Sequence, residues 1–162
     1  MIHFQPVSAL LPIPTTARYL PADYALRVDP ESAIPTQEHR ISIDTLTLSL
    51  RSTDHVLVGL HAYTNAERWH HRQLALPPVD QEMAVHCIEL FDEHGIGQGS
   101  SDPVRYTYSE ETSLLLIEVS EDQVVTRIRC LSCGICGLGV DGGLIEIWVQ
   151  GLSSIRRQGS KL

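Results

Sequence analysis

The sequence lacks any apolar run of the roughly 18 residues that a membrane-spanning helix needs. Its N-terminus also lacks the pattern of a signal peptide, because Pro12 and Pro14 interrupt the short apolar stretch around Leu10. These absences predict a cytoplasmic protein with no membrane partner. In that reducing compartment the four cysteines are expected to be thiols or metal ligands rather than disulfides.

Positive charge is also scarce, because 12 Lys and Arg stand against 20 Asp and Glu, which gives a formal net charge of −8. The one basic run is Arg156-Arg157 with Lys161, near the end of the chain. Binding to nucleic acid depends on clustered Lys and Arg, so we predict no nucleic-acid partner. An acidic balance favours solubility and, secondarily, basic partners.

No catalytic constellation is present. No serine stands in a Gly-x-Ser-x-Gly context, and the Gly97-Gln-Gly99 run lacks the lysine of a phosphate-binding loop. The paired carboxylates Glu110-Glu111 fall in a predicted turn, where water rather than a cleft would surround them. We therefore predict no catalytic residues, and we favour a function that is not enzymatic.

What the chain does have is alternation of apolar and polar residues, in two separate tracts. Residues 40–50 alternate with a slip at Asp44-Thr45, which predicts a strand with a bulge or bend, and residues 56–63 read as the returning strand of a hairpin. Residues 104–149 form the second tract and include the hairpin signal Val140-Asp-Gly-Gly. Both tracts predict antiparallel sheet over a shared interior.

Residues 80–94, between the two tracts, show helical spacing, with Cys87 on the apolar arc. Asp80 can cap the start of a helix and Gly95 its end. A strand over residues 85–91 fits the polar positions less well. We therefore predict an α+β fold, mainly an antiparallel β-sheet with one amphipathic helix packed on it.

The chain is also interpreted as an internal repeat. An offset of 87 residues aligns Arg40 with Arg127, Asp54 with Asp141 and Leu57 with Leu144. A further shift of two residues fits the last strands equally well, because it keeps each side chain on its face. We predict a single domain, residues 1–162, in which units 17–67 and 104–154 are duplicated hairpins joined by the helix. The alternative is a chance likeness between two hairpins.

A short motif links the second tract to known proteins. Tyr108-Ser-Glu-Glu-Thr-Ser-Leu-Leu-Leu-Ile117 resembles the opening strand, Tyr-Asp-x-x-x-Asp-x-Leu-Tyr-Ile, of a family of small bacterial domains of unknown function. That family closes with a Gly-Ile-Glu-Ile-Leu strand after an Asp-x-x-Gly turn, which Asp141-Gly-Gly and Ile145-Glu-Ile-Trp148 resemble. The resemblance covers residues 108–149, with serines in place of the family's two aspartates. It implies a small β-rich fold with no established activity.

The sharpest chemical feature is Cys130-Leu-Ser-Cys133-Gly-Ile-Cys136, to which Cys87 could add a fourth sulfur ligand. Four thiolates suit a tetrahedral zinc site or an iron–sulfur cluster. The run lacks the fourth nearby cysteine of a bacterial ferredoxin and the second Cys-x-x-Cys of a zinc ribbon. The alternative is that the four cysteines are buried structural thiols.

These observations support two functions. The first is a non-catalytic bacterial interaction or accessory protein, of the immunity type or self-associating, which binds a protein partner or forms a homodimer. The alternative is a zinc or iron–sulfur binding protein that uses the cysteine cluster. An enzyme with a pocket between the two halves has no residue set to support it.

Overall fold

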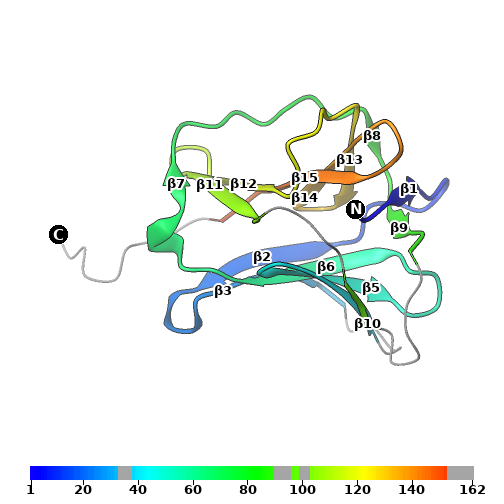
Figure 1. Ribbon diagram of the computed structural model, residues 1–162, viewed down its shortest axis with the longest axis horizontal. Helices are drawn as coiled ribbons and strands as arrows, with labels where there is room; N and C mark the ends of the chain where they lie inside the picture. The colour runs from blue at the N-terminus through cyan, green and yellow to red at the C-terminus, as the bar shows by residue number, and fades with distance from the viewer. Residues whose placement is uncertain (33–37, 90–95, 99–102, 153–162) are drawn as a thin grey trace.

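Two β-sheets stacked face to face make up most of the protein, in a computed structural model that describes residues 1–32, 38–89, 96–98 and 103–152 (Figure 1). The first sheet is built mainly from the first tract, and the second sheet mainly from the second. A small two-stranded sheet, β1 (Phe4–Pro6) with β9 (Val85–Cys87), lies at one end.

The first sheet has six strands and includes a turn at the point where the sequence pattern predicts a bulge or bend. Asp44, with a φ of 51°, makes a tight turn that divides residues 40–50 into two strands. In spatial order the strands are β10 (Ile96–Gln98), β4 (Glu38–Ile43), β5 (Leu46–Arg51), β6 (Leu57–Tyr63), β3 (Ala25–Pro30) and β2 (Thr15–Leu20). Neighbouring strands are antiparallel except β10 and β4.

The second sheet has seven strands, two of which are very short and parallel to their neighbours. In spatial order they are β7 (His70–His71), β11 (Arg105–Ser109), β12 (Leu114–Glu118), β15 (Leu144–Val149), β14 (Gly134–Leu138), β13 (Thr126–Leu131) and β8 (Gln81–Glu82). The parallel pairs are β7 with β11 and β8 with β13. The described residues also include two short 3-10 turns, η1 (Pro21–Asp23) and η2 (Ala66–Arg68).

The α+β prediction is wrong, because the described residues contain no helix of seven or more residues and are mostly strand. Of the predicted helix at residues 80–94, residues 80–89 are extended and contain β8 and β9, and residues 90–94 lie outside the described part. Ala84 packs in one apolar cluster and Val85 and Cys87 in another, so the segment buries both faces with a period of two. No described helix is long or apolar enough to cross a membrane.

The two sheets share one strand order. Strands β2 to β6 lie in the order β2-β3-β6-β5-β4, and strands β11 to β15 lie in the order β11-β12-β15-β14-β13. Leu57 begins β6 and Leu144 begins β15, which are residues that the 87-residue offset aligns. An internal duplication would produce this agreement, and the repeat of 17–67 and 104–154 stays a prediction.

A single hydrophobic core lies between the sheets. It contains Leu48 and Leu60 from the first sheet and Leu115, Ile117 and Ile147 from the second, each with at most 2% of its surface exposed. Burying one such side chain is worth about 1.5–3 kcal/mol. The alternating apolar residues of both tracts therefore face a common interior.

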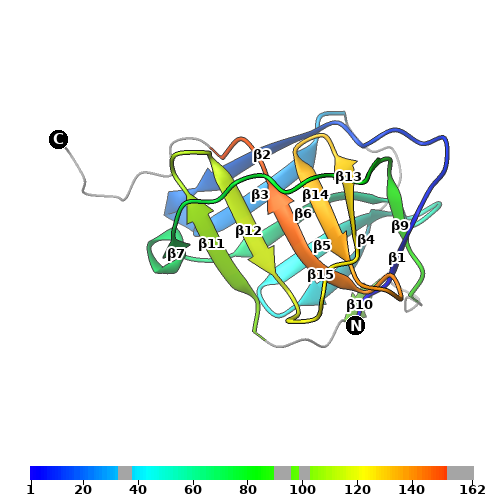
Figure 2. The ribbon, with the colours of Figure 1, turned by 90° about the horizontal axis from the view of Figure 1, so that it is seen from above.

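A second, smaller core covers the outer face of the second sheet. Residues 72–80, called the strap below, cross this face from β7 to β8 (Figure 2). Leu74 of the strap packs with Leu114, Leu116, Ile135 and Trp148 of the sheet. The N–H of Arg72 donates to the carbonyl of Tyr108 and the N–H of Asp80 to the carbonyl of Arg127, so backbone hydrogen bonds hold both ends.

The same outer face contains a buried carboxylate. Glu146 is only 9% exposed. Its Oε2 accepts a hydrogen bond from Arg127 Nε at 3.2 Å and another from Trp148 Nε1. Gly137 provides the space, because a Cβ there would lie 2.4 Å from Glu146 Cγ. The charge is thus paired and hydrogen-bonded, as burial requires.

The strap offers a matched pair of substitutions. Leu74→Ala should lower the free energy of unfolding by about 2–3 kcal/mol, because it removes a buried side chain and leaves a cavity. Leu76→Ala, in the same strap but 38% exposed, should change it by less than about 0.5 kcal/mol. Denaturant unfolding measures both, and equal effects would show that the strap does not pack as described.

Candidate functional site

The four long strands nearest the sheet edges differ in whether a further short strand pairs with their outer side. Short parallel strands cover β11, β13 and β4, namely β7, β8 and β10. Strand β2 is the exception, since no described residue forms a strand on its outer side. An uncovered edge strand presents unpaired N–H and C=O groups to any extended chain. This edge is the first part of the candidate site.

Hydrogen bonding defines which groups of β2 point outward. Backbone groups of an antiparallel strand alternate between facing the neighbour and facing away. The N–H of Glu31 donates to the carbonyl of Pro14 at 2.9 Å, so the backbone groups of Pro14 and of every second residue after it face β3. The backbone N–H and C=O groups of the residues between them, Thr15, Ala17 and Tyr19, therefore face away from β3.

Among these three residues, Thr15 alone has a hydrogen-bond partner for its outward backbone groups within the described chain. Ser132 Oγ accepts from the N–H of Thr15 at 2.8 Å and lies 3.1 Å from its carbonyl oxygen. No backbone hydrogen bond within the described chain reaches the outward groups of Ala17 or Tyr19. Two successive outward positions are therefore open to a further strand.

The outer face of the first sheet forms the second part of the site. No described segment crosses it as the strap crosses the second sheet. A hollow of about 290 Å³ opens on it, lined by Arg27, Arg40, Ser49 and His61 among others. Gly59 also lines the hollow, and a Cβ there would lie 2.4 Å from the carbonyl oxygen of Val28. Only glycine fits where these backbones approach so closely.

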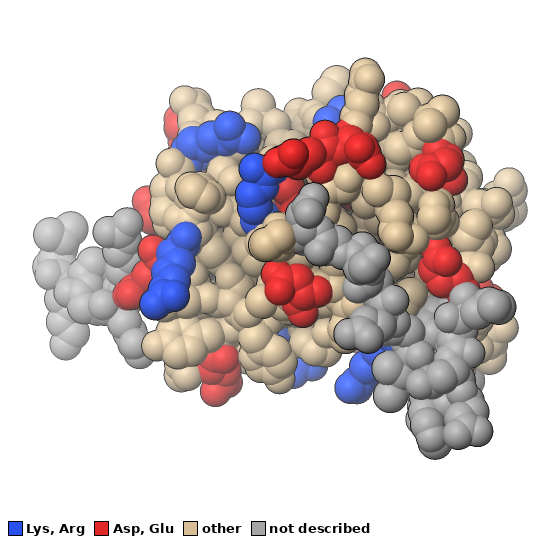
Figure 3. Space-filling view, in the orientation of Figure 1, with Lys and Arg blue, Asp and Glu red and all other residues tan. Residues whose placement is uncertain are grey.

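Charges of both signs lie on this face, because Asp29 and Glu38 line the hollow together with Arg27 and Arg40. Arg18 lies directly opposite Arg27. Asp29 Oδ2 pairs with both, at 3.6 Å from Arg18 Nη2 and 3.3 Å from Arg27 Nε. Arg40 forms no ion pair with any described residue. Figure 3 shows Lys and Arg side chains interspersed with Asp and Glu side chains on one side of the molecule.

Burial and the charges of these arginines both change the pKa of the neighbouring His61. Burial lowers the pKa of His61, and the nearby charges of Arg40 and Arg27 lower it further, against weaker opposing effects of Asp29 and Glu38. His61 is therefore neutral at neutral pH, with one ring N–H to donate. The hollow thus presents hydrogen-bond donors and, in Arg40, a guanidinium that forms no ion pair with a described residue, alongside the carboxylates of Asp29 and Glu38.

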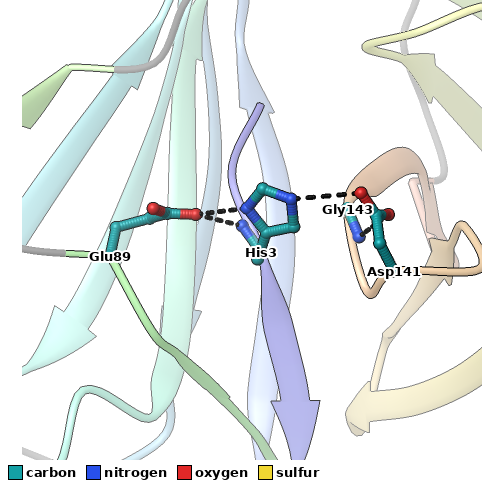
Figure 4. Close-up of polar contacts among 4 residues, drawn as sticks. All are labelled: His3, Glu89, Asp141 and Gly143. Carbon is teal, nitrogen blue, oxygen red and sulfur yellow. Dashed lines mark hydrogen bonds and ion pairs between the residues drawn. The ribbon is translucent and has the colours of Figure 1, made fainter.

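A separate polar cluster joins the N-terminal segment to two distant loops (Figure 4). Glu89 Oε1 accepts from the backbone N–H of His3 at 2.6 Å and lies 2.7 Å from its Nδ1. Asp141 Oδ2 lies 3.3 Å from His3 Nε2, and Asp141 Oδ1 accepts from the N–H of Gly143 at 3.0 Å. The two carboxylates flank the ring on opposite sides, so His3, Glu89 and Asp141, called the clamp below, connect the N-terminal segment to the two loops.

The hydrogen bond to Glu89 raises the pKa of His3 above its ordinary 6.5, against the opposing effect of burial. A raised pKa means that the clamp stabilises the fold fully below about pH 6.5 and loses this contribution as the pH rises through the folded-state pKa. His3→Gln should therefore cost a few tenths to about 1 kcal/mol at about pH 5.5 and less at about pH 8.5.

Urea unfolding at both pH values measures this difference. The matched control is His70→Gln, at an exposed residue of β7. It should show no comparable dependence on pH. A cost for His3→Gln that stays constant or grows toward high pH would contradict the proposed protonated clamp.

The predicted metal ligands do not converge. The Sγ atoms of Cys130 and Cys136 lie 3.0 Å apart in the core. Cys133 Sγ instead lies 3.0 Å from Thr15 Oγ1, and Cys87 is buried on β9. Among the described residues, no three His, Cys, Asp or Glu side chains are grouped to hold a metal ion. The zinc or iron–sulfur hypothesis stays a prediction, which elemental analysis of the purified protein tests.

Thiol reactivity should distinguish the four cysteines. Burial raises the pKa of Cys87 to about 11, and Cys130 and Cys136 are fully buried. Only Cys133 is partly exposed. A thiolate-selective reagent should therefore modify one thiol slowly in the native protein and all four in urea. Cys133→Ser should abolish the native reaction, and fast native reaction at Cys130 or Cys136 would contradict this burial.

A scan against protein-family models and a search of curated proteins found no match to this chain. The resemblance of residues 108–149 to small bacterial domains therefore stays a prediction. The candidate site rests on geometry that the sequence analysis missed. One arginine stands on each of the strands β2, β3 and β4, and only the strand order and register place the three on one face.

Proposed function

We propose that the protein is non-catalytic and binds another protein, by adding an extended segment of that partner to β2. The observation that supports this proposal is the uncovered edge of β2, in a fold whose other three long edge strands each have a short partner. Strand addition uses main-chain hydrogen bonds for affinity and side chains for specificity. Ala17 and Tyr19 offer two N–H and two C=O groups for this purpose.

A different protein fits this edge better than a second copy of the chain. Two copies joined through the outward groups of Ala17 and Tyr19, in antiparallel pairing, would place Arg18 opposite the same arginine of the other copy. Like charges directly opposite each other on paired strands are destabilising, and each chain has a net charge of −8. A partner segment with an acidic side chain opposite Arg18 would instead gain from charge complementarity.

A proline substitution at Ala17 tests the proposal. The N–H of Ala17 points away from β3, so Ala17→Pro removes a donor for an incoming strand without removing a β2–β3 hydrogen bond. The tagged protein should recover one stoichiometric partner. Ala17→Pro should weaken binding of that partner at least about tenfold, which corresponds to about 1.4 kcal/mol, as measured by titration calorimetry.

The matched control is Ala17→Val, which keeps the N–H and should bind like the unaltered protein. Circular dichroism and the unfolding midpoint show whether each variant is folded. A folded Ala17→Pro variant that binds its partner normally would refute addition at β2. Recovery of the protein alone, as a stable dimer that Ala17→Pro dissociates, would replace the foreign partner with a second copy.

A further inference from the structure

The buried carboxylate of the second sheet defines a three-part arrangement. Arg127 lies opposite Gly137, and Gly137 lies opposite Glu146 on the next strand. Glu146 Oε2 accepts from Arg127 Nε at 3.2 Å and also from Trp148 Nε1. A guanidinium and a ring N–H, two strands apart, thus hold one carboxylate on the outer face of the sheet.

The first sheet repeats the two donors of this arrangement without the carboxylate. At the 87-residue offset, Arg40 corresponds to Arg127, His61 to Trp148 and Gly59 to Glu146. The register agrees, because Arg40 lies opposite Ser49 and Ser49 lies opposite Gly59. His61 follows Gly59 by two residues on the same face of β6, as Trp148 follows Glu146 on β15. The position of the buried carboxylate is occupied here by a glycine.

The hollow lies at this position. Arg40, Gly59 and His61 all line it. Residue 59 cannot itself supply a carboxylate, because any Cβ would lie 2.4 Å from the carbonyl oxygen of Val28. Arg40 has no carboxylate partner within the described chain, unlike Arg127. Within the described chain, this position is therefore open to a carboxylate of another molecule.

We propose that the hollow is a carboxylate-binding site, in which Arg40 and His61 hold the carboxylate in the position that Glu146 fills in the second sheet. Arg40 supplies the charge-assisted hydrogen bonds that guanidinium groups make to carboxylates. His61 donates its ring N–H, as Trp148 does to Glu146. The ligand is an acidic side chain of a peptide or a small free carboxylate, and the site does not depend on strand addition at β2.

Binding should be visible through the protonation of His61. The charges that act on its ring are Arg40 and Arg27, opposed by Asp29 and Glu38. A bound carboxylate adds negative charge beside the ring and so raises its pKa. The affinity should therefore increase as the pH falls through the pKa of His61, which a purely structural role of Arg40 would not produce.

The experiment follows the ring signals of His61 by NMR during titration with three probes. They are succinate, a capped Ala-Glu-Ala peptide and the matched capped Ala-Gln-Ala peptide. We expect a saturable shift and a raised His61 pKa with succinate, with the glutamate peptide, or with both, and none with the glutamine peptide. Binding of succinate alone identifies a free carboxylate ligand, and binding of the glutamate peptide identifies a side chain.

Two variants complete the test. Arg40→Gln should weaken binding at least tenfold while the unfolding midpoint stays close to that of the unaltered protein. Arg105→Gln removes an exposed arginine from the second sheet and should leave binding unchanged. The proposal is overturned if neither carboxylate probe saturates, if the glutamine peptide binds equally well, or if the two variants weaken binding to the same extent.

Discussion

The packing of two apolar sheet faces against each other is the constraint on which this protein depends. Each strand of the two tracts gives alternate side chains to the shared core, and Leu48 and Ile117 are almost completely buried there. Because side chains alternate across a strand, the same packing fixes which residues lie on the two outer faces. The strap covers the apolar part of the second outer face, and the first outer face is polar. The candidate site is thus a consequence of how the core is filled.

The alternation of the two tracts was sufficient to predict antiparallel sheets with a common interior. The predicted helix at 80–94 failed because residues 80–89 bury both faces, with Ala84 in one cluster and Val85 in another. A short segment that is apolar on two sides imitates one helical stripe in sequence. The slip at Asp44 predicts a bulge or bend, and only the left-handed conformation of that residue distinguishes the turn between two strands that is found there.

The site was less predictable than the fold. The spacing of the cysteines predicted a metal site. However, neighbouring residues of a strand point to opposite faces, so the strand register decides which sulfur atoms lie close together. Arg18, Arg27 and Arg40 lie on three consecutive strands of the chain, one arginine to each strand, and form no local sequence motif. Their common face follows only from the order β4-β5-β6-β3-β2. The 87-residue offset contained the correspondence between Gly59 and Glu146, but without the register it had no chemical meaning.

The position of the strap in the sequence affects how the protein folds during its synthesis. Residues 72–80 precede every long strand of the sheet that they cover, so a ribosome releases them before their binding surface exists. Leu74 and Val79 must stay exposed to water, or bound to a chaperone, until β15, which contributes Trp148 to the smaller core, has been synthesised. Closure of the smaller core is therefore a late step of biogenesis, and an interrupted nascent chain would expose this apolar segment to aggregation.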